Sequence, residues 1–242
     1  MIFFILFYLL FFALPSRPLF AFDLEGEVKV ETPIPTTPWV TIQPEHQLDC
    51  GKEKPSAALE VSKEGWVANA VVYLEGIDPE SRGDRPVAPT DDNYLLDQAG
   101  CEFVPHVIII PPWATLSILN SDGFLHNVRA FEGTTMLFND AMPERGQILK
   151  KNFKKPGTFL IRCGIHPWMH AIVVVQKHSY YALTNQAGYF KLKDIPNEIY
   201  RLVVWHETLG EMKVDVTPET GHLNLTFPRK EPINPSDKAS SK

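Results

Sequence analysis

Short apolar segments of strand length, separated by turn residues and hardly ever by a helical stripe, recur along this chain from residue 67 to residue 227. Alternating or unbroken apolar runs of about four to eight residues between Gly, Pro, Asn and Asp clusters indicate β-strands. The 21 prolines agree with this pattern, because proline removes a backbone donor and disrupts helices. The sequence therefore predicts an all-β protein built from sandwiches or barrels.

The strands can be placed from the periodicity of the apolar residues. Residues 171–175 form an unbroken Ile and Val run, which predicts a strand buried on both faces. Prolines after residue 31 predict an extended linker up to residue 57, and the polar mixture between residues 77 and 92 predicts a surface loop. The expected strands are residues 27–31, 67–76, 103–110, 114–118, 158–162, 171–175, 180–184, 189–193, 200–205, 212–216 and 223–227.

Length and charge narrow the class of protein. A chain of 242 residues has room for one large β domain or two small ones, and 44% apolar residues are enough to build a core. The 23 Lys and Arg against 29 Asp and Glu give a net charge of −6, which disfavours nucleic-acid binding. The sequence has no nucleophile elbow, no phosphate loop and no zinc-protease helix pattern. We therefore do not expect an enzyme.

The first residues indicate export. Residues 1–14 are an uncharged apolar run, and a short Pro-rich and apolar stretch follows it up to Ala21. This pattern predicts a signal peptide over residues 1–21 and a periplasmic or secreted protein with no membrane association after cleavage. An uncleaved anchor is the alternative, although the run is shorter than the roughly 20 residues that span a bilayer.

The chain has three cysteines, an odd number. In an oxidising compartment an odd count suggests one disulfide and one thiolate with a separate role. Cys163 has a histidine and a methionine close by as potential metal ligands, whereas Cys50 and Cys101 have only Gly51 and Glu102 as neighbours. We therefore predict a Cys50–Cys101 disulfide. Three buried thiols in a reducing compartment would fit the export signal poorly.

A soft donor set surrounds Cys163. Cys163, His166 and Met169 follow C-x2-H-x2-M on one tight loop, and His126 is expected at the end of an earlier strand, after a turn. One thiolate, two imidazoles and one thioether match a trigonal copper site with a weak axial methionine, whereas zinc prefers four strong donors. We predict one type 1 copper site, with another metal or a metal-free sandwich as alternatives.

The other histidines are weaker candidates for metal ligands. His106 lies in a predicted strand that could reach the same end of the sandwich, although strand alternation is the simpler explanation. His170 follows Met169 and should point to the opposite face, so we predict a surface position for it. The histidines with no partner pattern are also predicted at the surface: His46, His178, His206 and His222.

The residues around these donors resemble the cupredoxins, the plastocyanin- and amicyanin-like blue copper proteins. The resemblance covers about residues 100–176 and consists of Phe-Val-Pro at 103–105, Asn-Ser-Asp at 120–122 before His-Asn-Val at 126–128, and Pro-Gly-Thr-Phe at 156–159 before the C-x2-H-x2-M loop. It implies a Greek-key cupredoxin sandwich over residues 95–177. It also implies equatorial ligands at His126, Cys163 and His166, and an axial one at Met169.

The same resemblance gives Asn127 a supporting role, a hydrogen bond across to the cysteine loop that stiffens it. Two residues depart from the family pattern. Ile161 stands two before the ligand cysteine, where many members carry an aromatic residue, and Cys101 is an extra cysteine. Neither departure removes a ligand. They therefore leave the reduction potential and the absorption spectrum of the site open, but not the binding of copper.

A second resemblance covers the flanks. Residues 182–192, Ile-Pro at 195–196 and Tyr-Arg-Leu-Val-Val at 200–204 are similar to the later half of carboxypeptidase regulatory-like (transthyretin-like) domains, and residues 67–76 match the opening strands. This implies a second small β-sandwich, split by the cupredoxin insertion. Its parts would be residues 22–94, with strands and linker, and residues 178–229, followed by a disordered tail over residues 230–242.

These observations predict an exported electron carrier, with c-type cytochromes or dehydrogenases as transient partners and His166 as the exit for the electron. The first alternative is a binding or scaffold protein that recognises a carbohydrate or a cell-surface protein and whose copper is structural or stored. The second is copper-dependent catalysis, which needs an open coordination position.

Overall fold

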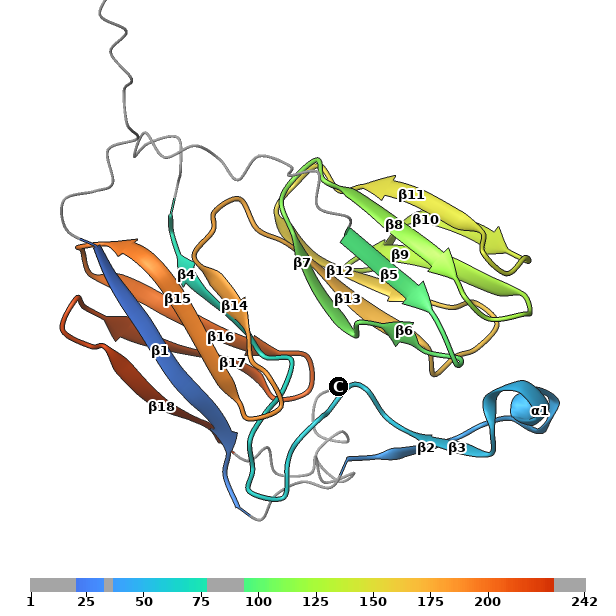
Figure 1. Cartoon of the computed structure of the whole chain (residues 1–242), viewed down its shortest axis with the longest axis horizontal. Coiled ribbons are helices and arrows are strands. Elements are labelled where there is room, and N and C mark those ends of the chain that lie inside the picture. Colours follow the sequence, from blue (N-terminus) through green and yellow to red (C-terminus); the bar gives the residue numbers. More distant parts are fainter. Residues whose placement is uncertain (1–20, 33–36, 78–93, 229–242) are drawn as a thin grey trace, which may run out of the picture.

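The computed structural model describes residues 21–32, 37–77 and 94–228, and nearly all of its regular structure is β-strand (Figure 1). The all-β prediction is therefore confirmed. Residues 1–20, 78–93 and 229–242, which hold nearly all of the predicted signal peptide, surface loop and tail, lie outside the described ranges. Within those ranges, no helix combines the length and the apolar character needed to cross a membrane.

The first sandwich contains two sheets with strand orders β15-β1-β18 and β14-β4-β16-β17. Their inward side chains, among them Leu24, Leu74 and Phe190, form one apolar core. The strands of this sandwich are β1 (Ala21–Val30), β4 (Val71–Glu75), β14 (Tyr181–Leu183), β15 (Tyr189–Pro196), β16 (Tyr200–His206), β17 (Gly210–Val216) and β18 (His222–Phe227).

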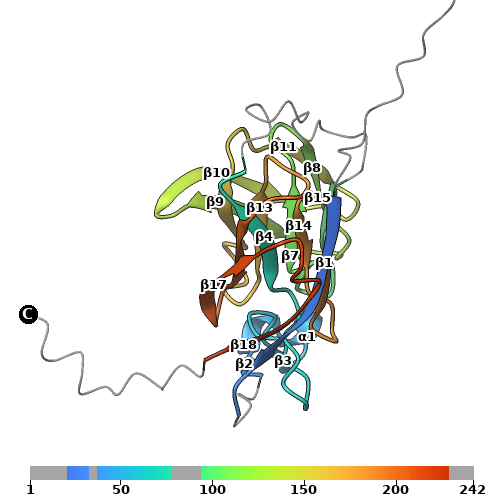
Figure 2. The ribbon, with the colours of Figure 1, turned by 90° about the vertical axis from the view of Figure 1, so that its left-hand side faces the viewer.

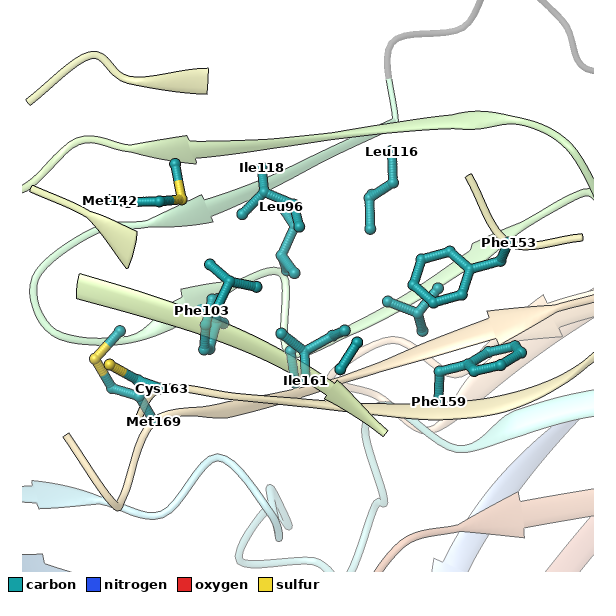
Figure 3. Packing of buried hydrophobic residues seen from close by; sticks show 14 of the residues in the cluster. Leu96, Phe103, Leu116, Ile118, Met142, Phe153, Phe159, Ile161, Cys163 and Met169 are labelled. Atoms are coloured by element: carbon teal, nitrogen blue, oxygen red, sulfur yellow. The ribbon is translucent and has the colours of Figure 1, made fainter. Parts of the chain in front are cut away.

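The second sandwich contains sheets with strand orders β10-β9-β12-β13-β7 and β11-β8-β5-β6. Figure 3 shows its core, in which Phe103, Ile118 and Ile161 lie between the two sheets. The strands are β5 (Tyr94–Gln98), β6 (Phe103–Val104), β7 (Val107–Ile110), β8 (Thr115–Asn120), β9 (His126–Glu132), β10 (Thr135–Met142), β11 (Ile148–Asn152), β12 (Gly157–Arg162) and β13 (His170–Val175).

The two sandwiches pack face to face through β13 and its neighbours. Val173 of β13 points into the second core, whereas Ile172 and Val174 join Val107 and Val71 in a separate apolar layer between the sandwiches. The prediction that residues 171–175 are buried on both faces is confirmed. Each large side chain buried in this way contributes roughly 1.5–3 kcal/mol.

The prediction of one strand over residues 103–110 is wrong. The chain forms β6 and β7 instead, and these lie in different sheets. Pro105 has no N–H for a ladder hydrogen bond, and the Val104–Pro105 peptide bond is cis. The chain therefore passes from one sheet to the other at Pro105 and His106.

The prediction of an extended linker over residues 32–57 is also wrong in part. This segment contains β2 (Trp39–Thr41), η1 (Pro44–His46), α1 (Gln47–Cys50) and β3 (Glu53–Pro55), with β2 paired to β3. Figures 1 and 2 both show α1 and this hairpin at the lower end of the fold. Ile42 and Cys50 are buried in the second core, and a disulfide joins Cys50 to Cys101.

Candidate metal centre

The C-x2-H-x2-M residues lie on the loop between β12 and β13, at one end of the second sandwich. Cys163 is the first residue after β12. Its N–H donates to the carbonyl oxygen of Met169 at 3.0 Å, and the N–H of Met169 donates to the carbonyl oxygen of His166 at 2.9 Å. These two bonds fold the loop back on itself and direct its donors to one side.

His126 reaches the same end of the sandwich from the neighbouring strand. It is the first residue of β9 and so lies at a strand end, directly after a turn. The turn after β8 delivers it, and Asn120 holds that turn by donating from its side-chain amide to the carbonyl oxygen of Phe124 at 3.0 Å. The turn that the sequence signalled therefore places His126 at the start of β9.

Three donor atoms converge. The Nδ1 atoms of His126 and His166 lie 3.0 Å apart, and the Sγ of Cys163 lies 3.5 Å from Nδ1 of His166 and 3.9 Å from Nδ1 of His126. The exposed fractions of these residues are 0% for His126, 5% for Cys163 and 3% for His166. The centre is thus a compact triangle of one sulfur and two nitrogens, shielded from water.

Asp122 fixes the orientation of His126, a role that the sequence did not reveal. Its Oδ2 lies 2.9 Å from Nε2 of His126, and the carboxylate also accepts from the N–H of Gly100 at 2.7 Å and of Cys101 at 2.9 Å. Because a carboxylate accepts, Nε2 of a neutral imidazole carries the proton here. In a neutral ring, as a metal ligand would be, the lone pair on Nδ1 therefore faces the cysteine and the other imidazole. In the metal-free protein burial lowers the pKa of His126, but the hydrogen bonds to Cys163 and Asp122 outweigh it and raise the pKa, so the charged ring donates from Nδ1 to the thiolate.

The same contacts favour a thiolate at Cys163. Burial raises the pKa of this thiol, but hydrogen bonds from the rings of His126 and His166 and from the N–H groups of Ile165 and Asn127 outweigh it and lower the pKa to about 5. A thiolate, not a thiol, binds metal ions. The ligand would therefore be ionised at neutral pH.

Asn127 links β9 to the cysteine loop. Its Oδ1 accepts from the N–H of Gly164 at 3.2 Å, and its Nδ2 donates to the carbonyl oxygen of Asp140 at 3.1 Å. The side chain thus ties the cysteine loop to β9 and β10. This link restrains the residue that directly follows Cys163.

Met169 is buried beside the triangle. It is 1% exposed, and Figure 3 shows its sulfur and that of Cys163 at the same end of the core. Met142, which pairs with His126 across β9 and β10, carries a second buried thioether nearby. The sulfur of Met142 already accepts a hydrogen bond from the side-chain amide of Gln98 at 3.1 Å. Met169 is therefore the better candidate for a metal ligand.

His166 is covered, contrary to expectation. The ring of His46, which ends η1, lies 4.7 Å from the ring of His166 and 5.7 Å from that of Trp168, and the rings of His166 and Trp168 are 5.2 Å apart. The sequence predicted a surface position for His46 and made His166 the exit for the electron. Because Cys50 is joined to Cys101, the segment that carries His46 is held over the centre.

Some of the remaining histidines also differ from prediction. His178 and His206 are buried rather than at the surface, whereas His222 is exposed as predicted and pairs with Glu27. His106 and His170 do not join the Cys163 centre. They form a separate group with Glu207, which is described below.

The donor set fits a soft or borderline metal ion. An ion about 2.0–2.3 Å from each donor in a trigonal arrangement would separate the donors by roughly 3.5–3.8 Å. The separations of 3.0, 3.5 and 3.9 Å between the three atoms bracket this range. A thiolate with two imidazoles and a thioether, shielded from water, suits copper better than zinc.

Comparisons with known proteins find likeness only among solved structures. No family model matches the chain, and no curated protein matches it. It is similar to a purple cupredoxin from Nitrosopumilus maritimus, at 24% identity over 35% of this chain and 100% of that one, with a TM-score of 0.32. It is also similar to amicyanin from Paracoccus versutus, at 19% identity over 43% of this chain and 97% of that one, with a TM-score of 0.33.

A third likeness is to a copper-containing nitrite reductase from Thermus scotoductus, at 24% identity over 42% of this chain and 27% of that one, with a TM-score of 0.32. This chain therefore spans about a quarter of the reductase. All three likenesses are confined to less than half of this chain.

Proposed function

We propose that the protein is an electron carrier with one type 1 copper site, whose strong ligands are His126, Cys163 and His166 and whose weak fourth ligand is Met169. The observation that carries the proposal is the buried triangle of Sγ and two Nδ1 atoms, none more than 3.9 Å from another. Bound there, copper would supply a one-electron couple between Cu(II) and Cu(I).

The protein's contribution is to hold the ligands still. Asp122 fixes the His126 ring, Asn127 restrains the loop next to Cys163, and the backbone bonds between Cys163 and Met169 close that loop. Ligands held in this way rearrange little when the charge of a bound ion changes. A site that rearranges little suits electron transfer better than chemistry on a substrate, which also needs an open position.

Contact with a redox partner runs through His46 and Trp168. Both side chains are half-buried, and their rings lie against the ring of His166. The partner, such as a c-type cytochrome or a dehydrogenase, therefore docks over the segment that carries His46 rather than directly on His166. This replaces the expectation that His166 itself is the exit for the electron.

The protein works in the periplasm or outside the cell, after removal of the predicted signal peptide. The disulfide between Cys50 and Cys101 supports an oxidising compartment, because cytosolic thiols are kept reduced. The second sandwich is inserted into the first, a carboxypeptidase regulatory-like domain. Support for this insertion comes from chain order, since β1 and β4 precede strands β5 to β13 and β14 to β18 follow them.

A second candidate function is carbohydrate binding with a structural or stored copper ion. One observation favours it: a cavity of about 400 Å³ lies between the sandwiches and is lined by Tyr73, Trp205, Gln176 and Glu211, among others. Aromatic rings beside polar side chains are suited to hold a sugar. Saturable glycan binding by a protein without a reversible one-electron couple would favour this function.

The absorption spectrum of the copper-loaded protein tests the first proposal. Wild type should show an intense visible band from thiolate-to-copper charge transfer and a reversible one-electron couple. Cys163→Ser should lose the band, whereas His222→Gln, which removes an exposed histidine, should keep it. A colourless wild type, or a Cys163→Ser variant that keeps the band, would overturn the proposal.

A further inference from the structure

A second group of metal-binding side chains lies where the two sandwiches meet. His106 directly precedes β7, His170 is the first residue of β13, and Glu207 directly follows β16. One ligand atom from each of the three residues lies within 4.8 Å of the others. Among the described residues, this is the one group of its kind apart from the Cys163 centre.

Strand alternation brings two of these side chains to the shared face. Ile172 and Val174 of β13 point at the first sandwich, and His170 has the same parity. Trp205 of β16 packs against the layer between the sandwiches, and Glu207 follows it by two residues. The three donors therefore sit at the edge of an apolar layer to which each sandwich contributes.

The contacts within the group show which atoms face one another. Nε2 of His106 closely contacts Oε1 of Glu207, and Nε2 of His170 lies 3.1 Å from Oε2 of the same carboxylate. The rings of His106 and His170 meet edge to face, with centroids 4.8 Å apart. One carboxylate thus lies between two imidazole nitrogens.

His170 has the support that metal-binding histidines usually have. Its Nδ1 lies 3.3 Å from the carbonyl oxygen of Trp168, which can only accept a hydrogen bond. When the proton of the neutral ring is on Nδ1, the lone pair of Nε2 faces the carboxylate of Glu207. Two electron-rich atoms in this arrangement require a cation between them, either a proton or a metal ion.

We propose that His106, His170 and Glu207 form a second metal site, which binds a divalent first-row cation such as Zn²⁺ and joins the two sandwiches. Two imidazoles and one carboxylate are a ligand set used for such ions, with water at the remaining position. The side chain of His106 is 7% exposed, but those of His170 and Glu207 are 22% and 18% exposed, so an ion can enter from solvent. The site shares neither a ligand nor a metal preference with the Cys163 centre.

Zinc titration of the copper-loaded protein, followed by calorimetry, tests the proposal. Wild type should bind one zinc ion per chain without change in its visible band, and zinc should raise its unfolding temperature. Glu207→Gln should not bind this zinc ion, and zinc should no longer raise its unfolding temperature. Glu211→Gln removes a nearby exposed acid that pairs with Lys213 and serves as the matched control, so it should behave as wild type.

The difference between wild type and Glu207→Gln decides the outcome. Equal zinc binding by the two proteins, or the same loss in Glu211→Gln, would overturn the second site. If Glu207→Gln does not fold, His106→Gln gives the same comparison. A protein that fails to bind copper would take up zinc at Cys163 as well, but wild type should still exceed the variant by one equivalent, so the two proposals fail independently.

Discussion

Replacing Asp122 by asparagine removes the charge that orients His126 and changes the shape of the side chain very little. The carboxylate accepts three hydrogen bonds of 2.7–2.9 Å, and its side chain is only 12% exposed. Asparagine has one acceptor oxygen, so its amide N–H group would face at least one of the donors at Gly100, Cys101 or His126. Hydrogen bonds to charged groups contribute about 1.5–3 kcal/mol, and a stranded buried donor costs about 1–3 kcal/mol.

We therefore expect Asp122→Asn to lower the free energy of unfolding of the metal-free protein by about 2–4 kcal/mol. Copper affinity should fall about 10–100-fold, as is typical when the carboxylate partner of a ligating histidine is lost. Urea denaturation measures the first effect, and competition with a copper chelator measures the second.

The stability that Asp122 contributes should depend on pH. Burial raises the pKa of Asp122, but hydrogen bonds from the Cys101 N–H, the His126 ring and the Gly100 N–H outweigh it and hold the pKa below its ordinary value of 3.8. Because the folded-state pKa is lowered, the stabilisation is complete above the unfolded-state value and is lost as the pH falls through the folded-state value. The stability difference between wild type and Asp122→Asn should therefore shrink in strong acid.

Asp140→Asn is the matched control. Asp140 pairs with Lys151 at 2.9 Å on the surface of the same sandwich, with both side chains partly exposed. Surface ion pairs of this kind contribute about 0–1 kcal/mol. If Asp122→Asn changed stability and copper affinity no more than Asp140→Asn does, the assignment of Asp122 as the residue that positions His126 would be refuted.

Three further predictions concern the Cys163 thiolate, the contact of His46 with His166, and the disulfide. In the metal-free protein the ultraviolet absorbance of the Cys163 thiolate should persist until the pH falls to about 5, and a midpoint near the ordinary cysteine value would contradict the hydrogen-bonded thiolate. His46→Ala should uncover His166 and speed reduction of the copper-loaded protein by a small-molecule reductant, and an unchanged rate would argue against His46 as a cover. Cys50→Ser should lower the free energy of unfolding, measured with denaturant, by about 4 kcal/mol, because the disulfide to Cys101 closes a loop with a sequence separation of 51. A decrease below about 1 kcal/mol would show that the loop is ordered without the disulfide.

Most strands could be predicted because their signals are local. The unbroken apolar run at residues 171–175 and the alternation at residues 189–193 each require a strand whatever surrounds them. The strands that escaped prediction, such as β10 and β11, carry polar and exposed residues on much of their length, so their apolar periodicity is weak. β6 and β7 were merged because the pattern on both sides of Pro105 is apolar, although each strand belongs to a different sheet.

In the candidate site, too, the contacts between residues close in sequence could be predicted, and those between distant residues could not. Cys163, His166 and Met169 are close in sequence, so their spacing alone indicates a shared loop. The contact between His46 and His166, and that between His106 and Glu207, join residues about a hundred positions apart, and they depend on how a covering segment and a whole sandwich pack. No local pattern encodes such contacts, although the doubly apolar β13 does indicate that its outer face is covered.

X-ray absorption at the copper edge of the loaded protein tests the central claim most directly, because it reports the atoms bound to the metal ion. The geometry of Cys163, His126 and His166 predicts one short sulfur neighbour and two imidazole nitrogens, with the sulfur lost in Cys163→Ser. A copper environment of oxygen and nitrogen atoms alone in wild type would contradict the account.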